Sequence, residues 1–151
     1  MARAAERLGS RTVAGLATAI VVAVAVLSRD WLSAVVATVA PVACFVLTEY
    51  VAKPLVNQPT PFGGRAYPSG HVAGVVAVAL SALVLVYRRW GGLAAAAFAP
   101  VAVAAVVSVG LGVLGLGFHP YPTDVLGGVA LGSTVVFTLT AVLSFATRPR
   151  G

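Results

Sequence analysis

The chain has 151 residues, of which 60% are hydrophobic and only 9% are charged. A soluble domain carries about 25% charged residues, so this composition excludes a protein with an ordinary water-facing surface. The net charge of +6 does not indicate nucleic-acid binding, because the ten basic residues are scattered at the ends of apolar runs, where they would meet lipid headgroups.

Five apolar runs follow one another along the chain, and they approach the roughly 20 residues that an α-helix needs to cross a bilayer. A lone segment in lipid must satisfy its own backbone hydrogen bonds, so we expect helices in spite of the many valines. The sequence therefore predicts an all-α fold, a polytopic membrane helical bundle with about five transmembrane helices in a single domain, residues 1–151. The expected spans are approximately 12–27, 32–52, 70–87, 93–117 and 124–146.

The first run follows a basic lead, residues 1–11, a combination that is also typical of a signal peptide. No clear small-residue cleavage site precedes the charged break at Arg29–Asp30, so we expect a retained helix followed by a tight turn. Trp31 then begins the second run as an interface anchor.

The second run contains Pro41, which we expect to kink it, and Cys44, which is expected to be a small buried apolar residue. Glu49 stands four residues before Lys53, the favourable order for an ion pair on a helix. Further on, Gly91-Gly92 follows Arg88-Arg89-Trp90 and is expected to form the turn between the third and fourth runs.

Two polar segments, residues 53–71 and 118–124, interrupt the apolar pattern. The third and fourth spans bring the chain back across the membrane, so both polar segments are expected on the same side. Each of the two is followed by a Gly-x-x-x-Gly motif, Gly70 to Gly74 and Gly128 to Gly132, which allows close helix packing. These motifs are also ordinary in membrane helices, but their positions suggest that the two helix starts approach each other.

The polar residues at these helix starts suit an anion. Ser69 stands where a helix N-cap belongs, and Gly70 and His71 form the first turn after it. A helix start offers free N–H groups and a positive dipole end. Lys53 adds a full positive charge, and Asp124 is placed at the start of the fifth helix, where the dipole favours a carboxylate.

His119 lies five residues before Asp124, close enough for a carboxylate to orient an imidazole. Two histidines, a carboxylate and a lysine would fit phosphoryl transfer, with one histidine as nucleophile and the other as general acid. Each residue also has a structural interpretation: an interfacial histidine, an N-cap aspartate, a lysine that snorkels to the headgroups. No metal is expected, because these residues and Cys44 do not form a recognisable zinc spacing.

The same residues resemble a known family. Lys53, Pro-Ser-Gly-His at residues 68–71, and His119 followed by Tyr-Pro-Thr-Asp-Val-Leu-Gly-Gly at residues 121–128 are similar to the motifs of the type-2 phosphatidic acid phosphatases. That family is related to bacterial acid phosphatases and vanadium haloperoxidases. The resemblance covers about residues 45–135.

The resemblance implies a metal-independent integral membrane phosphatase, without a cofactor, that hydrolyses a lipid phosphomonoester or diphosphate through a phosphohistidine intermediate. It implies that His119 is the nucleophile, that Asp124 orients it, and that His71 protonates the leaving oxygen. Lys53, Ser69 and the Gly70 amide would bind the phosphate. The implied partners are a lipid phosphate substrate and the bilayer.

The chain departs from the family pattern at both phosphate-binding arginines. Their places are taken by Thr60 and by Val113 of the pair Gly112-Val113, and one extra residue separates His119 from Asp124. Each charge-assisted contact is worth roughly 1.5–3 kcal/mol, so two missing arginines would weaken transition-state binding by a factor of about a hundred or more. Arg65, in the first polar segment, is the candidate substitute.

Two alternatives therefore stay open. The chain would be a catalytically impaired relative that binds a lipid phosphate or assists assembly, or a small carrier or channel subunit whose polar segments line a pathway. The expected location is a bacterial plasma membrane. Basic residues are divided equally between the two sides, but when Lys53 and Arg65 are set aside as site residues, the positive-inside rule places the polar segments on the outer face.

Overall fold

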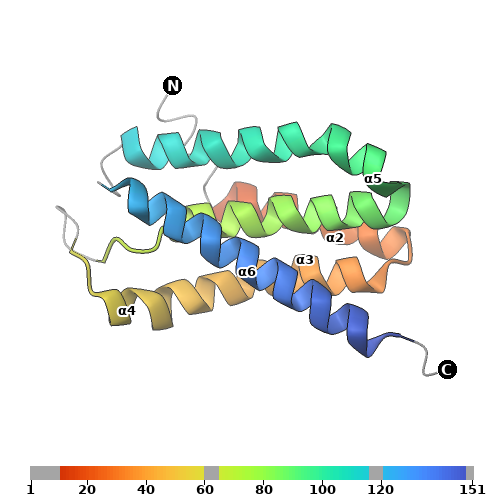
Figure 1. The fold of residues 1–151 in the computed structure, drawn as a ribbon, viewed down its shortest axis with the longest axis horizontal. Coiled ribbons are helices and arrows are strands. Elements are labelled where there is room, and N and C mark those ends of the chain that lie inside the picture. The colour runs from red at the N-terminus through yellow and green to blue at the C-terminus, as the bar shows by residue number, and fades with distance from the viewer. Residues whose placement is uncertain (1–10, 60–64, 116–120, 149–151) are drawn as a thin grey trace.

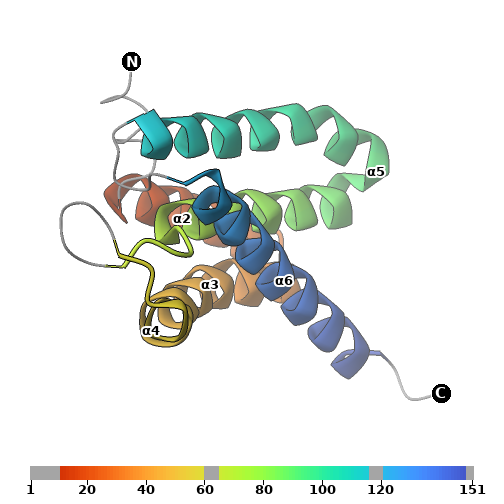
Figure 2. The ribbon, with the colours of Figure 1, turned by 60° about the vertical axis from the view of Figure 1, so that its left-hand side comes forward.

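The protein is a bundle of helices that lie side by side (Figures 1 and 2). Its computed structural model describes residues 11–59, 65–115 and 121–148, and these residues contain no β-strand, only an isolated antiparallel bridge between Pro59 and Arg65. The elements are α2 (Arg11–Leu27), α3 (Trp31–Val46), the π-helix η1 (Leu47–Ala52), α4 (Lys53–Val56), α5 (Gly70–Gly115) and α6 (Pro122–Ala146). The prediction of an all-α fold is confirmed.

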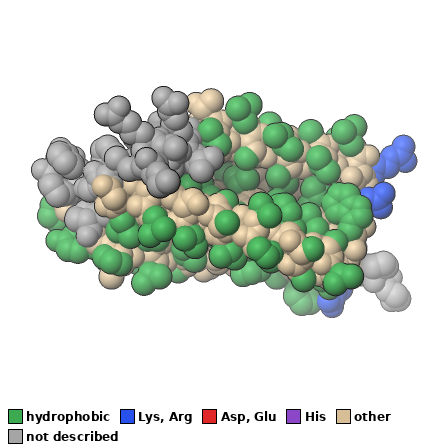
Figure 3. All heavy atoms as spheres, turned by 90° about the horizontal axis from the view of Figure 1, so that it is seen from above, with side chains coloured by type: hydrophobic (Ala, Val, Ile, Leu, Met, Phe, Trp, Pro, Cys, Tyr) green, Lys and Arg blue, Asp and Glu red, His purple; other side chains and the backbone are tan. Residues whose placement is uncertain are grey.

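Three stretches are long and apolar enough to cross a membrane: Trp31–Val56, Gly70–Gly115 and Pro122–Ala146, of 26, 46 and 25 residues. The helix α2 is also apolar but has 17 residues. Large hydrophobic side chains cover the outside of the bundle, and the lysine and arginine side chains visible in Figure 3 lie at one end. A surface of this kind indicates an integral membrane protein.

The helix α5 consists of two antiparallel arms that meet at Gly91, as the fold-back at the right of Figure 1 shows. Gly91 has φ 85° and ψ −178°, a backbone conformation that a residue with a Cβ rarely adopts. The expected turn between the third and fourth apolar runs is therefore confirmed. The predicted end of the third span, residue 87, was nevertheless three residues early, because the helical geometry continues through Arg88, Arg89 and Trp90 up to this glycine.

The turn between α2 and α3 is also confirmed, with Arg29 in the left-handed region at φ 57°. Asp30 caps α3 by accepting hydrogen bonds from Ser33 N at 3.3 Å and Ser33 Oγ at 2.7 Å. Arg88 Nε donates to the same carboxylate at 3.0 Å, so one aspartate joins this turn to the turn in α5. Trp31 is 65% exposed beside them, as an interface anchor requires.

The prediction that the second span ends at residue 52, with a polar loop from Lys53, was wrong. The chain stays helical to Val56 through η1 and α4, and Asn57, at φ 51°, ends the helix. The wider π turn ends at Ala52, two residues before Pro54, whose ring would crowd the carbonyl group four residues earlier in a regular α-helix. Pro41 lies inside α3, which is continuous from Trp31 to Val46.

The prediction that the last helix starts at Asp124 was also wrong, by two residues. The helix α6 begins at Pro122, with Tyr121 as its N-cap residue, so Asp124 lies in the first turn and is not the cap. Proline is favoured at the first helical position, because its fixed φ suits the helix and its missing N–H would have no partner there.

The core lies where the first arm of α5 packs between α3 and α6. Its largest apolar cluster is formed by small side chains, among them Val36, Ala40, Ala73, Val136 and the predicted buried Cys44. A second cluster joins both arms of α5 to α6 and lies closer to the start of α6; its buried members are Val72, Val76, Val109 and Val113. Small residues let the helix backbones approach closely, which is how helices associate in lipid.

Candidate functional site

The starts of α5 and α6 meet at one end of the bundle. Ser69 N donates a hydrogen bond of 2.9 Å to the carbonyl oxygen of Asp124, which joins the two polar segments through their backbones. In Figure 1 these helix starts lie together at the end opposite the Gly91 turn. Since both helices begin here, two positive dipole ends share this region, and it is electrostatically suited to a negative charge.

Ser69 is the N-cap residue of α5, as predicted. Its carbonyl oxygen accepts from Ala73 N at 3.0 Å, and its hydroxyl oxygen accepts from Val72 N at 3.5 Å. The side chain is completely buried. The cap therefore fixes the orientation of the first helical turn, which carries Gly70 and His71.

The Gly128 to Gly132 motif is what lets α6 come this close. A Cβ built on Gly128 would lie 2.7 Å from Ser69 O, and one built on Gly132 would lie 2.8 Å from Ala73 O. No residue with a side chain fits at these distances, so both glycines face the α5 backbone. The expectation that the two helix starts approach each other is confirmed.

The Gly70 to Gly74 motif packs differently from the Gly128 to Gly132 motif. A Cβ on Gly70 would lie 3.3 Å from Thr48 Cγ2 and 3.4 Å from Glu49 Oε1, whereas a Cβ on Gly74 would meet nothing within 4 Å. Gly70 therefore faces η1, and only one member of this motif serves close packing. This contact brings the π turn to the phosphate-binding position that was predicted at Gly70.

Lys53 forms the predicted ion pair with Glu49: the distance from Nζ to Oε1 is 2.5 Å. The side chains are 19% and 35% exposed, so the pair lies at the edge of the region. The backbone N–H of Lys53 donates to Thr48 O, as the wider π turn requires. Lys53 is thus in a helix next to Gly70, and the Glu49 carboxylate neutralises its charge.

Asp124 is completely buried in the first turn of α6, where the helix dipole favours a carboxylate. His71 is exposed in the first turn of α5. His119, the predicted nucleophile, and Thr60, one of the two departures, lie outside the described residues. Ser69, Gly70 and Asp124 thus lie together, and Lys53 is linked to them through the side chain of Glu49.

Arg65 lies in the segment that connects α4 to α5, and its side chain is exposed. Its Nε donates a hydrogen bond of 3.0 Å to Asn57 Oδ1, and Ala66 N donates to Gln58 O at 2.8 Å. Arg65 thus links the segment just before α5 to the end of α4. Four further guanidinium N–H groups remain on Arg65 for an acceptor, since arginine carries five donors.

Sequence reasoning missed two residues of this region. The Tyr67 ring lies over α6, because a Cβ on Gly127 would meet its Cε2 at 2.5 Å and its hydroxyl oxygen at 2.9 Å. Thr48, inside an apolar run, is completely buried against Gly70. The pair Gly127-Gly128 was a usable signal for Tyr67, whereas nothing in the sequence distinguished Thr48 from an ordinary membrane threonine.

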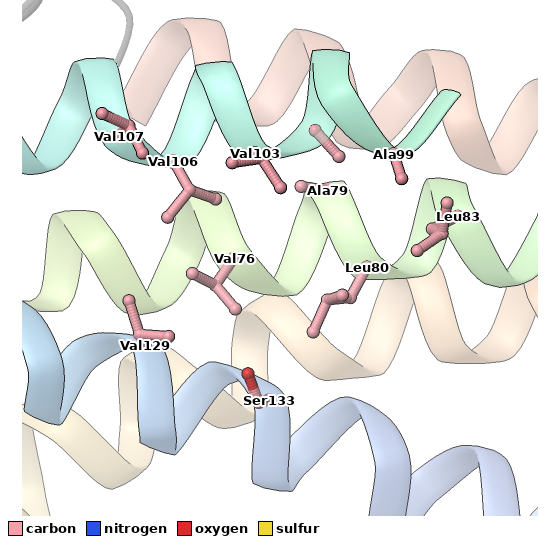
Figure 4. A pocket seen from close by; sticks show the side chains of 11 residues that line it. Val76, Ala79, Leu80, Leu83, Ala99, Val103, Val106, Val107, Val129 and Ser133 are labelled. Atoms are coloured by element: carbon pink, nitrogen blue, oxygen red, sulfur yellow. The ribbon is translucent and has the colours of Figure 1, made fainter. Parts of the chain in front are cut away.

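An apolar hollow of about 210 Å³ opens between the two arms of α5 and α6 (Figure 4). Val76, Leu80, Val103, Val106 and Val129 are among its lining side chains, with Ser133 as the one hydroxyl. Since Val76 and Val129 also belong to the second apolar cluster, the hollow continues from the packing beneath the helix starts. Such a surface is suited to contact with hydrocarbon, and none of its lining side chains is ionisable.

Within the described part of the chain, no group of three or more His, Cys, Asp or Glu side chains could hold a metal ion. Comparisons with protein-family models, with curated proteins and with solved structures found no match for this chain.

Proposed function

We propose that the protein is an integral membrane phosphatase that hydrolyses a lipid phosphomonoester or diphosphate, in the manner of the type-2 phosphatidic acid phosphatases that its motifs resemble. The observation that carries this proposal is the hydrogen bond from Ser69 N to Asp124 O, which holds Pro-Ser-Gly-His against the start of the helix with the proposed carboxylate. Residues far apart in the sequence thereby share one end of the bundle, as a common active site requires.

In the proposed reaction, an imidazole nitrogen of His119 attacks phosphorus, and the bond from phosphorus to the ester oxygen breaks. His71 gives its proton to the leaving oxygen, and water then hydrolyses the phosphohistidine to release inorganic phosphate. Asp124 orients His119 for the attack. The buried position of Asp124 supports this role, since a carboxylate in a low-dielectric site interacts strongly with an imidazolium.

Lys53, Arg65, Ser69 and the Gly70 amide would bind the phosphate oxygens. The start of α5 supplies backbone N–H groups that have no partner within the helix. Arg65 keeps its contact with Asn57 and presents its remaining N–H groups to the phosphate. Glu49 competes with the phosphate for Lys53, so binding depends on how readily this ion pair opens.

The proposed topology has five membrane crossings: α2, α3 with η1 and α4, the two arms of α5, and α6. Arg29 lies in the turn between α2 and α3, Arg88 and Arg89 lie just before the turn in α5, and Arg148 follows α6. By the positive-inside rule, these residues support a cytoplasmic position for this end of the bundle in a bacterial cell. The site would then lie at the outer face of the plasma membrane. The hydrocarbon of the substrate would lie along the apolar hollow, which continues from the cluster beneath the site.

The test is phosphate release by the purified protein in detergent, with a panel of phosphatidate and polyprenyl phosphates and diphosphates. We expect release from at least one lipid, and loss of release in His119→Ala. Thr138→Ala is the control, because Thr138 is exposed on α6 well beyond its first turns. Release that persists in His119→Ala would contradict the proposed mechanism.

A second candidate is a lipid-phosphate-binding protein that does not catalyse hydrolysis. It is favoured by Val113, which occupies one family arginine position and is buried in an apolar cluster with Val72 and Val109. Among the described residues of this cluster, no charged side chain replaces the arginine. Binding of lipid phosphates without release from any of them would support this candidate over the enzyme.

A further inference from the structure

Thr48 carries a buried hydroxyl group for which the described residues provide no hydrogen bond. Its residue is 0% exposed, and Oγ1 has no hydrogen-bond partner in the part of the chain that the structure describes. A threonine in a helix often bonds to the carbonyl group one turn earlier, as Thr38 does with Ala34 O at 2.8 Å. A buried polar group without a partner destabilises a fold, so the hydroxyl calls for another explanation.

The position of Thr48 indicates what its partner could be. Its methyl group is 3.3 Å from the place where a Cβ of Gly70 would stand, so the side chain lies against the first residue of α5. Its carbonyl oxygen accepts the N–H of Lys53, and its neighbour Glu49 holds the Lys53 ammonium group. Thr48 therefore belongs to the same cluster as the proposed phosphate ligands Lys53 and Gly70.

The π turn is what places these groups together. Residues 47–52 form η1, and one-turn π segments inside α-helices frequently occur at functional sites. Glycine at position 70 lets Thr48 and Glu49 pack against the start of α5, because a Cβ there would already touch both side chains. The cluster thus brings the Thr48 side chain, the ion pair of Lys53 with Glu49 and the positive start of a helix close together.

We propose that Thr48 Oγ1 donates a hydrogen bond to a phosphate oxygen bound beside Lys53 and the Gly70 amide. A phosphate group carries several acceptor oxygens, and hydroxyl, ammonium and helix-start N–H donors are complementary to it. This inference rests on the proposed function, because it adds a ligand to that phosphate site. The bound phosphate could belong to a lipid or be free inorganic phosphate, and the contact is the same for both.

The test compares Thr48→Val, which keeps the shape and removes the hydroxyl, with Thr48→Ser, which keeps the hydroxyl. The affinity for inorganic phosphate is measured by inhibition of lipid hydrolysis, KM is measured with the lipid phosphate, and thermal unfolding is followed in detergent. We expect Thr48→Val to weaken both phosphate interactions by about tenfold, the effect of one hydrogen bond to a charged group. Thr48→Ser should stay within about threefold of the parent protein.

Stability distinguishes this role from a structural one. Since the hydroxyl has no hydrogen-bond partner among the described residues, Thr48→Val should unfold at the same temperature as the parent protein or higher. Thr140→Val is the matched control, because Thr140 Oγ1 is also buried without a hydrogen-bond partner in the described chain, but lies far along α6. It should leave both phosphate interactions unchanged.

Unchanged phosphate affinity in Thr48→Val would overturn the inference, and so would a lower unfolding temperature in that variant. Weaker lipid binding with unchanged inorganic phosphate inhibition would also overturn it, because the hydroxyl would then contact another part of the lipid. If the parent protein neither hydrolyses nor binds any lipid phosphate, the proposed function itself fails. That result is distinct from a phosphatase that is indifferent to Thr48.

Discussion

The two ends of the bundle use the same kinds of residues in opposite ways. At the Gly91 end, Asp30 caps a helix, and its carboxylate accepts hydrogen bonds from Ser33 and Arg88 at the surface. At the other end, Asp124 is completely buried in the first turn of a helix, and the link to α5 runs through its backbone carbonyl group. The first arrangement joins two turns through a side chain, whereas the second joins two helix starts through a backbone carbonyl group.

The difference shows how a membrane bundle of small residues can hold a polar site. Close backbone packing by Gly128 and Gly132 fixes the helix starts, so the polar side chains do not have to do so. At the Gly91 end the ion pair between Asp30 and Arg88 performs that task, and its Arg88 side chain is 40% exposed. Each end can be perturbed separately, which makes the comparison testable.

The largest effect is expected from Gly128→Ala. The new Cβ would lie 2.7 Å from Ser69 O, so α6 must move away from α5, at a cost of roughly 1–3 kcal/mol in the free energy of unfolding. Phosphatase activity should be lost with it. Gly74→Ala is the control, because a Cβ there meets nothing within 4 Å and alanine is a better helix former than glycine. Equal unfolding temperatures for the two variants in detergent would contradict the close crossing.

The second largest effect is expected from Asp124→Asn, which should lower the rate of catalysis. The neutral amide cannot stabilise an imidazolium, so phosphate release should fall by about 10²–10⁴-fold with little change in KM. Asp30→Asn serves as the partner variant at the other end, where asparagine remains a good N-cap residue and activity should be unaffected. Comparable loss of activity in both variants would remove the functional distinction between the ends.

A smaller effect, and of the opposite sign, is expected from Glu49→Gln. The substitution removes the negative charge that holds Lys53, so the ammonium group becomes available to the phosphate. The inhibition constant for inorganic phosphate should decrease by roughly three- to tenfold, the effect of about 1 kcal/mol of partly screened charge. Weaker phosphate binding would show instead that Glu49 positions Lys53 for the ligand.

The smallest effect is a pH dependence at the Gly91 end. Burial raises the pKa of Asp30, but the hydrogen bonds from Arg88 and Ser33 outweigh it, and the pKa lies below its usual value. The ionised carboxylate therefore stabilises the fold fully above the unfolded-state pKa of about 3.9, and this contribution is lost as the pH falls through the folded-state pKa. Unfolding temperatures measured from pH 6 to pH 3 should fall less in Asp30→Asn than in the parent protein.

Local features of the chain were predictable from the sequence because their partners lie within one helical turn or one tight bend. The Ser69 cap, the ion pair of Glu49 with Lys53 and the turn at Gly91 follow from spacing and residue type alone. The helix boundaries at Val56 and Pro122 were missed. At the first boundary, the polar Lys53 does not end the helix, which continues to Val56. At the second, Pro122 serves as the first helical residue.

The sequence by itself determined that the chain is a helical membrane protein, because its apolar runs approach the length of a bilayer and must satisfy their own backbone hydrogen bonds. It also determined which residues can carry chemistry, because few residues of the chain are charged. Only the tertiary structure decided which of them meet. The bond from Ser69 to Asp124, the Tyr67 ring over Gly127 and the buried Thr48 beside Gly70 all depend on how closely helices approach. The Gly-x-x-x-Gly motifs predicted that the two helix starts approach each other. They could not predict which atoms meet, because those contacts depend on packing between residues far apart in the chain.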